Sequence, residues 1–346
     1  MKAVVYEDVG TIRVGDVPDP VIEDARDAIV RVTRAAICGS DLHFYHGKAP
    51  LGPGDTMGHE AAGVIEAVGP EVERFEVGDR VVVAFDIVCG HCWFCLHGQT
   101  SLCDDFRVLG IGTFGGELGG AQAEHVRVPY ADVNLLAIPE GMEDERALFV
   151  GDNLTTGYYG AAIAGIQPGD SVAVVGAGSV GFFCVQSAAL QGAKEVIALD
   201  LEADRLALAE KVGATAINVK ERNPQMAVSE LTEGRGADVV IEAVGSRPAF
   251  ETAVEIVRRG GAISVVGMYV SETLEIPLGF YWSRALRIQF AGVCPIHSWW
   301  ERAMKAVQAG TIDPLPIISH VLPLSEAVRG YELFDSRQAT KVVLKT

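Results

Sequence analysis

The sequence is short of basic residues. Among its 346 residues, 28 lysines and arginines stand against 46 aspartates and glutamates, a formal net charge of −18 at pH 7. Because phosphate backbones and anionic lipid headgroups are bound by positive surfaces, this balance argues against a nucleic-acid-binding protein and against docking on a membrane. The partner we expect is a small molecule.

Long apolar runs are also missing. The most apolar longer stretch, residues 172–190, is interrupted by three glycines and then by Gln186 and Ser187, so it is a poor membrane span. The N-terminal MKAVVYEDVG lacks the basic region, the long apolar region and the cleavage site of a signal peptide. We therefore expect a cytoplasmic protein, in which clustered cysteines are more often metal ligands than disulfides.

Two patterns divide the chain, and its length favours two domains. Up to about residue 150, short β-branched runs are separated by Gly, Pro and Asp clusters. From Pro168, strand-like runs such as SVAVVG and KEVIALD alternate with helix-length segments, of which RPAFETAVEIVRRGG is one. This alternation is typical of a parallel sheet. We predict a β-rich domain at 1–152 and 291–346, interrupted by an α/β domain at 153–290.

A glycine loop follows the first strand of the α/β domain. VAVVGAGSVG places Gly176, Gly178 and Gly181 in a G-x-G-x-x-G that follows a strand and opens a helix. The first glycine permits a tight turn, the second lets the backbone approach a pyrophosphate, and the third lets helix and strand pack closely. The free N–H groups at the helix start favour the phosphates. The loop predicts a dinucleotide site.

Asp200 ends the next strand. Its spacing along the sequence from the glycine loop is that of a carboxylate that accepts hydrogen bonds from the adenosine ribose. It would repel a 2′-phosphate, which favours NAD over NADP. The alternative is a solvated loop carboxylate. Arg205 follows at a distance that suits the adenine side of the cofactor, although a surface helix arginine fits its position equally well.

Four cysteines, Cys89, Cys92, Cys95 and Cys103, lie within 15 residues in the pattern C-x2-C-x2-C-x7-C. Closed coordination by four thiolates is typical of structural zinc, with no open position for substrate. A disulfide pair would need an oxidising compartment. An iron–sulfur site usually ends in Cys-Pro, and a zinc ribbon that binds nucleic acid is disfavoured by the acidic charge. We expect this segment to fold around zinc, away from the reacting centre.

A second group of metal-type residues lies earlier, in CGSDLH and GHEAAG, which contain Cys38 and His59. Catalytic zinc takes three protein ligands of mixed type and keeps one position open. Taken alone, these two residues could also be a buried thiol and a core histidine.

Residues 58–72, GHEAAGVIEAVGPEV, match the signature G-H-E-x2-G-x5-G-x2-V of the medium-chain, zinc-dependent alcohol dehydrogenases. CGSDLH, the four cysteines, TTGYYGA and the glycine loop follow that family's order and spacing, so the chain resembles it over nearly its whole length. The resemblance implies a GroES-like β-rich catalytic domain with both zinc sites, interrupted by a Rossmann domain with a doubly wound parallel sheet. The active site of the family lies in the cleft between them.

The resemblance assigns the catalytic zinc to Cys38, His59 and Asp152, with Glu60 entering or leaving the metal shell as substrate exchanges. Many members have cysteine at the position of Asp152. Because an oxygen ligand donates less charge than a thiolate, zinc would be more electrophilic here. On sequence alone, Asp152 could instead be a helix N-cap ahead of Thr155.

The resemblance also implies a mechanism. Zinc polarises the alcohol oxygen as a Lewis acid, and hydride passes to the nicotinamide. Ser40 and then His43 carry the proton away, although His43 could equally be an idle surface side chain. Asp41 resembles the carboxylate that orients the zinc-bound histidine. Phe85 matches a wall of the substrate pocket, with a core position as the alternative.

Four further positions match those that hold the nicotinamide half of the cofactor in the family: Thr156, Val244, Val266 and Gly267. Ser179, Val180 and Met268 are also expected to bind the cofactor. The family often uses the stretch that matches residues 265–278 for contact between subunits, so we expect a homo-oligomer, with a tetramer favoured over a dimer.

The substrate is the least determined feature of the sequence. Apolar LGFYWS and HSWW favour a small, fairly apolar primary or secondary alcohol. Polyol, threonine and formaldehyde dehydrogenases of the same family are the alternatives. A non-catalytic NAD-binding protein is a further one, and the intact set of Cys38, Ser40, His59 and Asp152 argues against it.

Overall fold

The computed structural model describes residues 1–270 and 273–346. They form two compact units, of which unit 1 consists of Met1–Thr155 and Pro295–Thr346 and unit 2 of Thr156–Cys294. The predicted boundaries, after residues 152 and 290, lie a few positions away. Within the described residues, no helix is both long and apolar enough to cross a membrane.

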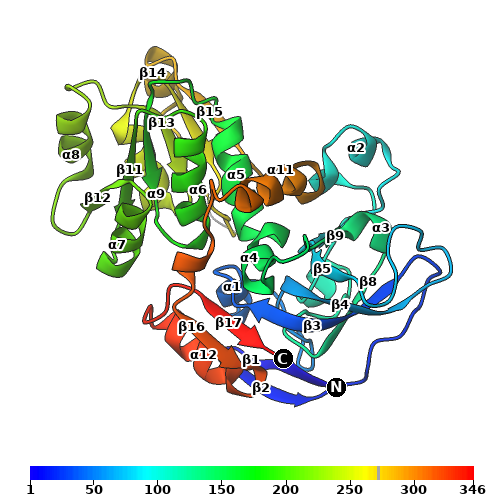
Figure 1. The fold of residues 1–346 in the computed structure, drawn as a ribbon. Coiled ribbons are helices and arrows are strands. Elements are labelled where there is room, and N and C mark those ends of the chain that lie inside the picture. Colours follow the sequence, from blue (N-terminus) through cyan, green and yellow to red (C-terminus); the bar gives the residue numbers. More distant parts are fainter. Residues whose placement is uncertain (271–272) are drawn as a thin grey trace. The chain divides into compact units, whose positions relative to one another are not determined.

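Unit 1 is built around a mostly antiparallel sheet (Figure 1). Its strands, in spatial order, are β16 (His320–Pro323), β17 (Val342–Lys345), β3 (Ala28–Ala36), β4 (Glu60–Val68), β5 (Arg80–Val83) and β9 (Leu135–Ala137), with β8 (His125–Val128) paired to β3. Because β3 pairs with β4 from Ala28↔Val68 to Ala36↔Glu60, the end of β3 lies beside the start of β4. Apolar strand residues such as Val30 and Ile65 are buried in its core.

Shorter elements complete unit 1. They are the hairpin β1 (Lys2–Asp8) and β2 (Thr11–Asp16), the ladder β6 (Asp86–Ile87) and β7 (Arg107–Val108), and the helices α1 (Asp41–Tyr45), α2 (Trp93–Leu96), α3 (Ala131–Asn134), α4 (Asp144–Leu148), α11 (Ile296–Gln308) and α12 (Ala327–Asp335). The predicted amphipathic helix near 298–310 is α11, and the predicted final strand is β17.

Unit 2, described over residues 156–270 and 273–294, is a parallel sheet between two helical layers (Figure 1). Its strands, in spatial order, are β12 (Thr215–Asn218), β11 (Glu195–Asp200), β10 (Ser171–Val175), β13 (Ala237–Glu242), β14 (Val257–Val265) and β15 (Arg287–Phe290). The helices are α5 (Asn153–Ile163), α6 (Ser179–Leu190), α7 (Ala203–Lys211), α8 (Pro224–Leu231), α9 (Arg247–Ile256) and α10 (Leu278–Ser283).

The apolar strands of unit 2 bury both faces. Since side chains alternate along a strand, Val172 and Val174 pack with α5, α6 and α7, whereas Ala173 and Val175 pack with α8 and α9. The sequence VAVV therefore has no polar face, which is typical of a parallel strand covered on both sides.

One predicted helix is too long. RPAFETAVEIVRRGG is helical only up to Ile256, and Val257 is already extended and pairs with Ala237. The partners then jump from Ala237↔Val257 to Val239↔Ala262, so residues 258–261 bulge out of the ladder. Gly260, with φ of 71°, permits this turn.

The strand order of the sheet switches at β10. The strands β11 and β12 lie on one side of β10, and β13, β14 and β15 lie on the other. In open parallel sheets, ligands bind at the carboxyl ends of the strands at such a switch point. The glycine loop after β10 and the loop after β13 lie at this place.

Candidate metal centres and cofactor site

In the described part of the chain, two clusters of side chains could hold a metal ion. The first unites Cys38, His59 and Asp152, whose ligand atoms all lie within 4.8 Å of one another. Asp152 Oδ2 is 3.6 Å from Cys38 Sγ and 3.4 Å from His59 Nε2. All three side chains are buried. One sulfur, one nitrogen and one oxygen donor form the mixed set that catalytic zinc takes.

Sheet pairing brings these residues together. Cys38 follows β3, and His59 precedes β4 at the same edge. Gly58 precedes the histidine with φ of 90°, and a Cβ there would lie 2.2 Å from Gln122 Cγ, so only glycine fits. Asp152 directly precedes α5, where it was also predicted as a possible N-cap, but its carboxylate lies against Cys38 and His59.

The electrostatics of this cluster favour a cation. Burial lowers the pKa of His59, but the carboxylates of Asp41 and Asp152 and the Cys38 sulfur outweigh it and raise that pKa well above its ordinary value. Burial raises the pKa of Asp152, and His59 more than reverses this. Three side chains that together stabilise a buried positive charge suit a divalent ion, which would take the place of the proton.

Buried polar side chains surround His59, and sequence reasoning missed all of them except Asp41. His59 Nδ1 lies 3.1 Å from Oδ1 of Asp41, the carboxylate that is expected to orient the ring. Asp41 Oδ2 accepts hydrogen bonds from Cys38 N and from Gln122 Nε2. Tyr331 donates its hydroxyl proton to Gln122 Oε1 at 2.9 Å. Such outer partners fix the ring orientation of a ligating histidine.

Ser40 lies next to two of the three possible ligands. Its hydroxyl oxygen lies 3.1 Å from both Cys38 Sγ and His59 Nε2. His43, in α1, is half-buried, and its pKa is lowered by burial and by the nearby Lys48 and His46. The Phe85 ring is half-buried, with its centroid 6.1 Å from that of His59.

Glu60 lies outside the ligand cluster. Its Oε2 pairs with Lys341 Nζ at 2.6 Å, and both side chains are fully buried. Lys341 also donates to Asn153 Oδ1, and Asn153 Nδ2 donates to Asp152 Oδ2 at 2.7 Å. Burial raises the pKa of Glu60 to about 7, and Lys341 opposes this. Glu60 as a ligand stays a prediction. A lysine inside the apolar run TKVVLKT was the signal that could have identified its partner.

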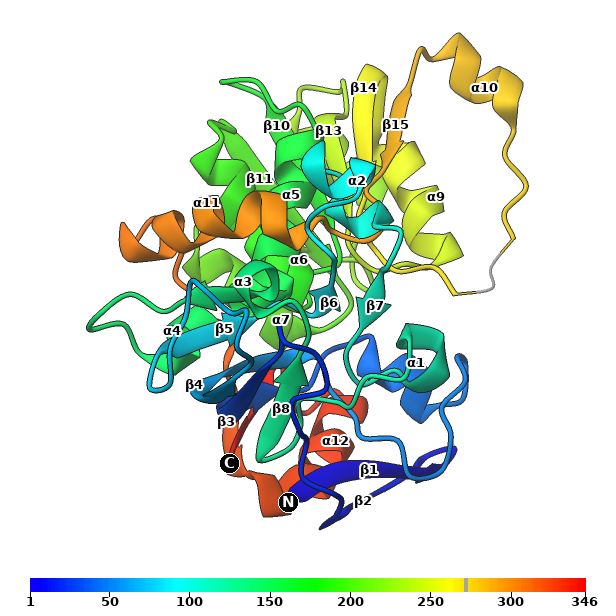
Figure 2. The same cartoon turned by 90° about the vertical axis from the view of Figure 1, so that its right-hand side faces the viewer.

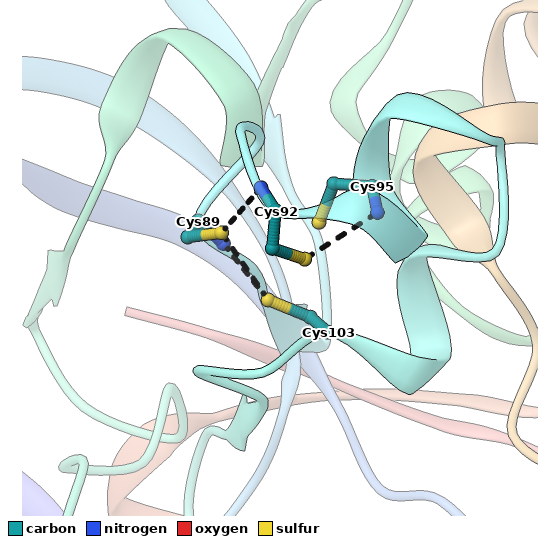
Figure 3. Close-up of side chains that lie close together, drawn as sticks. All are labelled: Cys89, Cys92, Cys95 and Cys103. Atoms are coloured by element: carbon teal, nitrogen blue, oxygen red, sulfur yellow. Dashed lines mark hydrogen bonds between the residues drawn. The ribbon is translucent and has the colours of Figure 1, made fainter.

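The second cluster consists of the four predicted cysteines, whose sulfur atoms lie within 4.8 Å of one another (Figure 3). Cys89 Sγ and Cys103 Sγ are 3.5 Å apart, and all four thiols are free. That separation is far longer than a disulfide of about 2 Å. Four thiols that face one point fit a closed tetrahedral zinc site.

Backbone amides support these sulfurs. Cys92 N donates to Cys89 Sγ, Cys95 N to Cys92 Sγ, and Cys89 N to Cys103 Sγ. Amides of Asp104 and Cys95 lower the pKa of Cys92 to about 6, whereas burial raises the pKa values of Cys95 and Cys103. Amides directed at sulfur stabilise thiolates, the form that binds metal.

Two residues that sequence reasoning missed anchor this cysteine segment. Asn134 accepts from Val88 N and donates to Val88 O, next to Cys89. His297 Nε2, in α11, lies 2.8 Å from Asn134 Oδ1. Burial lowers the pKa of His297 to about 3, so this ring is neutral.

The predicted cofactor residues lie in unit 2, and most of them follow the carboxyl ends of its strands. Gly176 (φ 93°) follows β10, Gly178 is the N-cap of α6, and a Cβ on Gly181 would lie 1.8 Å from Gly176 O. Ser179 and Val180 are the first residues of α6. Val244 follows β13, Val266, Gly267 and Met268 follow β14, and Thr156 lies in α5.

Asp200 is 9% exposed, so it is not a solvated loop carboxylate. Its Oδ2 accepts from Ala177 N in the glycine loop at 2.7 Å, and its Oδ1 accepts from Leu201 N and Glu202 N. Arg205 Nη1 lies 3.9 Å from Asp200 Oδ2. Asp200 thus fixes the glycine loop, a role that the sequence did not indicate.

Known proteins share this arrangement. Residues 24–140 match the alcohol dehydrogenase GroES-like domain, and residues 179–309 match the zinc-binding dehydrogenase domain. The chain is 40% identical to an uncharacterized zinc-type alcohol dehydrogenase-like protein of Bacillus subtilis, over 100% of both chains. The chain belongs to the medium-chain zinc alcohol dehydrogenase family. It is therefore an oxidoreductase that acts on CH–OH groups.

Solved structures agree with this assignment. The alcohol dehydrogenase TADH from Thermus sp. ATN1 is 42% identical, with a TM-score of 0.96 over 100% of this chain and 99% of that one. A zinc-binding dehydrogenase of Sinorhizobium meliloti 1021 bound to NADP is 31% identical (TM-score 0.87; 100% and 99% covered). Galactitol-1-phosphate dehydrogenase from Escherichia coli is 27% identical (TM-score 0.88; 100% of both covered). The predicted fold, a GroES-like domain interrupted by a Rossmann domain, is confirmed.

Proposed function

We propose that this dehydrogenase oxidises a primary or secondary alcohol with NAD, or reduces the matching aldehyde or ketone with NADH. The observation that carries the proposal is the buried cluster of Cys38, His59 and Asp152 with the Ser40 hydroxyl 3.1 Å from two of its ligand atoms. A non-catalytic NAD-binding protein has no chemical use for this set.

The cluster would hold the catalytic zinc, which when bound supplies Lewis-acid polarisation of the substrate oxygen. Asp41, through His59, keeps the imidazole nitrogen aimed into the cluster. In this proposal the Ser40 hydroxyl accepts the proton of a substrate hydroxyl and passes its own proton on. Because the lowered pKa of His43 keeps it neutral near pH 7, this ring can accept that proton in turn.

The four cysteines would hold a second zinc with a structural role, since four thiolates leave no open position. The proposed location is the cytoplasm, because clusters of metal-binding thiolates persist in reducing compartments.

NAD would bind unit 2, with its pyrophosphate at the glycine loop and the start of α6. Asp200 supports NAD over NADP, because its buried negative charge repels a 2′-phosphate. Because one similar structure is bound to NADP, the activity assay below compares NAD with NADP.

We also propose a homo-oligomer, with a tetramer favoured. The support comes from the edge of the sheet of unit 2, where α10 projects beside β15 (Figure 2). Leu278, Phe280, Trp282 and Phe290 are each more than half exposed there, a patch of a kind that marks interfaces. Of the predicted contact stretch 265–278, residues 271–272 lie outside the described part of the chain.

A polyol is the second candidate substrate, because one relative is galactitol-1-phosphate dehydrogenase. Formaldehyde has the support of a relative that is 32% identical over 99% of this chain, the glutathione-independent formaldehyde dehydrogenase of Pseudomonas aeruginosa. Threonine rests on the resemblance alone. The test is the absorbance of reduced cofactor after the protein is mixed with NAD or NADP and a panel of simple alcohols, polyols, threonine and formaldehyde. We expect the fastest signal with NAD and a simple alcohol. A faster signal with NADP would contradict the assignment of Asp200, and no signal with any pair would contradict the proposed function.

A further inference from the structure

Two loops follow the neighbouring parallel strands β13 and β14, where the nicotinamide half of the cofactor is proposed to rest. Val244, in the first loop, is 49% exposed, and Met268, in the second, is 41% exposed. Large apolar side chains left open at the ligand edge of a parallel sheet are suited to be covered by a ligand. The position of these two loops therefore matters for the cofactor.

A single buried carboxylate joins the loops. Glu242, the last residue of β13, is fully buried. Its Oε1 accepts hydrogen bonds from Val244 N at 2.8 Å and Gly245 N at 2.9 Å. Its Oε2 accepts from the hydroxyl of Tyr269, which follows β14, at 3.1 Å. The same hydroxyl lies 3.3 Å from Ser246 O. We call these contacts the Glu242 network.

The two loops also touch directly, backbone against backbone. A Cβ on Gly267 would lie 2.0 Å from Gly245 N, and one on Gly245 would lie 2.2 Å from Met268 O. A Cβ on Gly176, in the glycine loop, would lie 2.5 Å from Val244 Cγ2. With no spare space between them, a shift of one loop must displace the other.

A carboxylate such as Glu242 is chemically suited to hold two loops together. A carboxylate only accepts hydrogen bonds, so it can satisfy several donors that converge from two loops. Burial raises the pKa of Glu242, and the N–H groups of Gly245 and Val244 and the Tyr269 hydroxyl oppose this. Without the carboxylate, those partly buried N–H groups would lose their acceptor, and the loop would have to move to pair them.

We propose that Glu242 is a positioning residue that holds the loops after β13 and β14 in the arrangement that binds the nicotinamide half of the cofactor. This inference rests on the proposed NAD-dependent function. It assigns Glu242 no contact with the cofactor or the substrate: the residue acts through Val244, Gly267 and Met268.

The test compares two ligands on the full-length protein. NADH carries the nicotinamide, whereas ADP-ribose carries only the adenosine and pyrophosphate part. We expect Glu242→Ala to weaken NADH binding, measured by nicotinamide fluorescence, about tenfold or more, and to leave ADP-ribose binding, measured by calorimetry, within about twofold. Glu242→Gln keeps one acceptor oxygen and should recover most of the NADH affinity.

Asp238→Ala is the matched control, because Asp238 is a nearly buried carboxylate at the other end of β13, where it accepts from Ser171 N and Arg258 Nε. It should lower thermal stability and leave both affinities unchanged. If Glu242→Ala does not fold, Tyr269→Phe removes one hydrogen bond of the network and should weaken NADH, but not ADP-ribose, about threefold.

Equal losses of NADH and ADP-ribose affinity, or no loss of NADH affinity in a folded variant, would overturn the inference. Its failure is distinct from failure of the proposed function, which would show as a wild-type protein that binds no NADH.

Discussion

The two metal centres of unit 1 share cysteine but differ in their surroundings. Cys38, His59 and Asp152 are buried and supported by side chains from distant segments, among them Gln122 and Tyr331. The four-cysteine cluster lies within one short segment, and backbone amides of that segment hold its sulfurs. The difference supports the proposal that the mixed cluster is a reactive centre held by the fold, whereas the four cysteines are a structural centre that keeps its own segment in shape.

The largest expected effect is at Asp152. Asp152→Ala should lower kcat with the best alcohol by about a thousandfold or more, because the zinc site loses one of three ligands, while the thermal midpoint changes by only a few degrees. Steady-state kinetics and circular dichroism measure the two quantities. Asp144→Ala, which changes a carboxylate in α4 outside the cluster, is the control. If Asp152→Ala kept its activity, the cluster of Cys38, His59 and Asp152 would not be the reactive centre.

The buried pair beside the reactive centre comes next. Lys341→Met leaves Glu60 buried without its partner, so we expect a loss of about 3 to 5 kcal/mol in the free energy of unfolding. The double variant Lys341→Met/Glu60→Gln should recover most of the loss. Urea unfolding measures both, and a double variant as unstable as the single one would show that packing rather than charge explains the effect.

In the cysteine segment, the expected effect is on stability. Cys95→Ala should lower the free energy of unfolding by about 2 to 4 kcal/mol and release one zinc, because the metal stabilises only the folded segment. The molecules that remain folded should keep most of their kcat. Cys184→Ala, which changes a buried cysteine of unit 2, is the comparison. A greater fall in kcat than in stability would indicate that the two centres are not separate in role.

The smallest expected effect is at Asp86, in the strand that leads to Cys89. Burial raises the pKa of this carboxyl well above its ordinary value, and the charge of Asp152 adds to this. Neither oxygen has a hydrogen-bond partner in the described structure. The folded protein thus holds this proton more tightly than the unfolded chain, and the resulting stability is present at low pH and lost as pH rises through the folded pKa.

Asp86→Asn should therefore match the wild type at about pH 3, below the ordinary pKa of an aspartate, and exceed it by about 1 to 2 kcal/mol at pH 8. Unfolding in urea at several pH values measures the difference. A gain that does not change with pH would contradict the assignment of a raised pKa to Asp86.

Local sequence could predict much of this molecule, and long-range pairing explains what it missed. The glycine loop and the four cysteines each lie within one short segment, so the spacing of their residues was sufficient to predict that each group lies together. Lys341 reaches Glu60 only because β17 pairs with β3, which in turn pairs with β4. Gln122 reaches Asp41, and Tyr331 reaches Gln122, from segments that are far apart in the sequence. Glu242 looked like the end of an apolar strand, and only the packing of two loops shows its hydrogen bonds.

The predicted helix over RPAFETAVEIVRRGG was too long for one local and one long-range reason. Its apolar period continues past Ile256, but Gly260 and Gly261 favour a turn, and Val257 gains a ladder pairing with Ala237. Tertiary pairing decided between two conformations that the sequence allowed.

The most direct test of the central claim follows zinc content, activity and folding together during titration with a chelator. We predict two zinc ions per chain. One should leave first and take the activity with it while circular dichroism stays unchanged, and the second should leave only as the protein unfolds. A single zinc per chain, or two that leave together with unfolding, would contradict the division into a reactive and a structural centre.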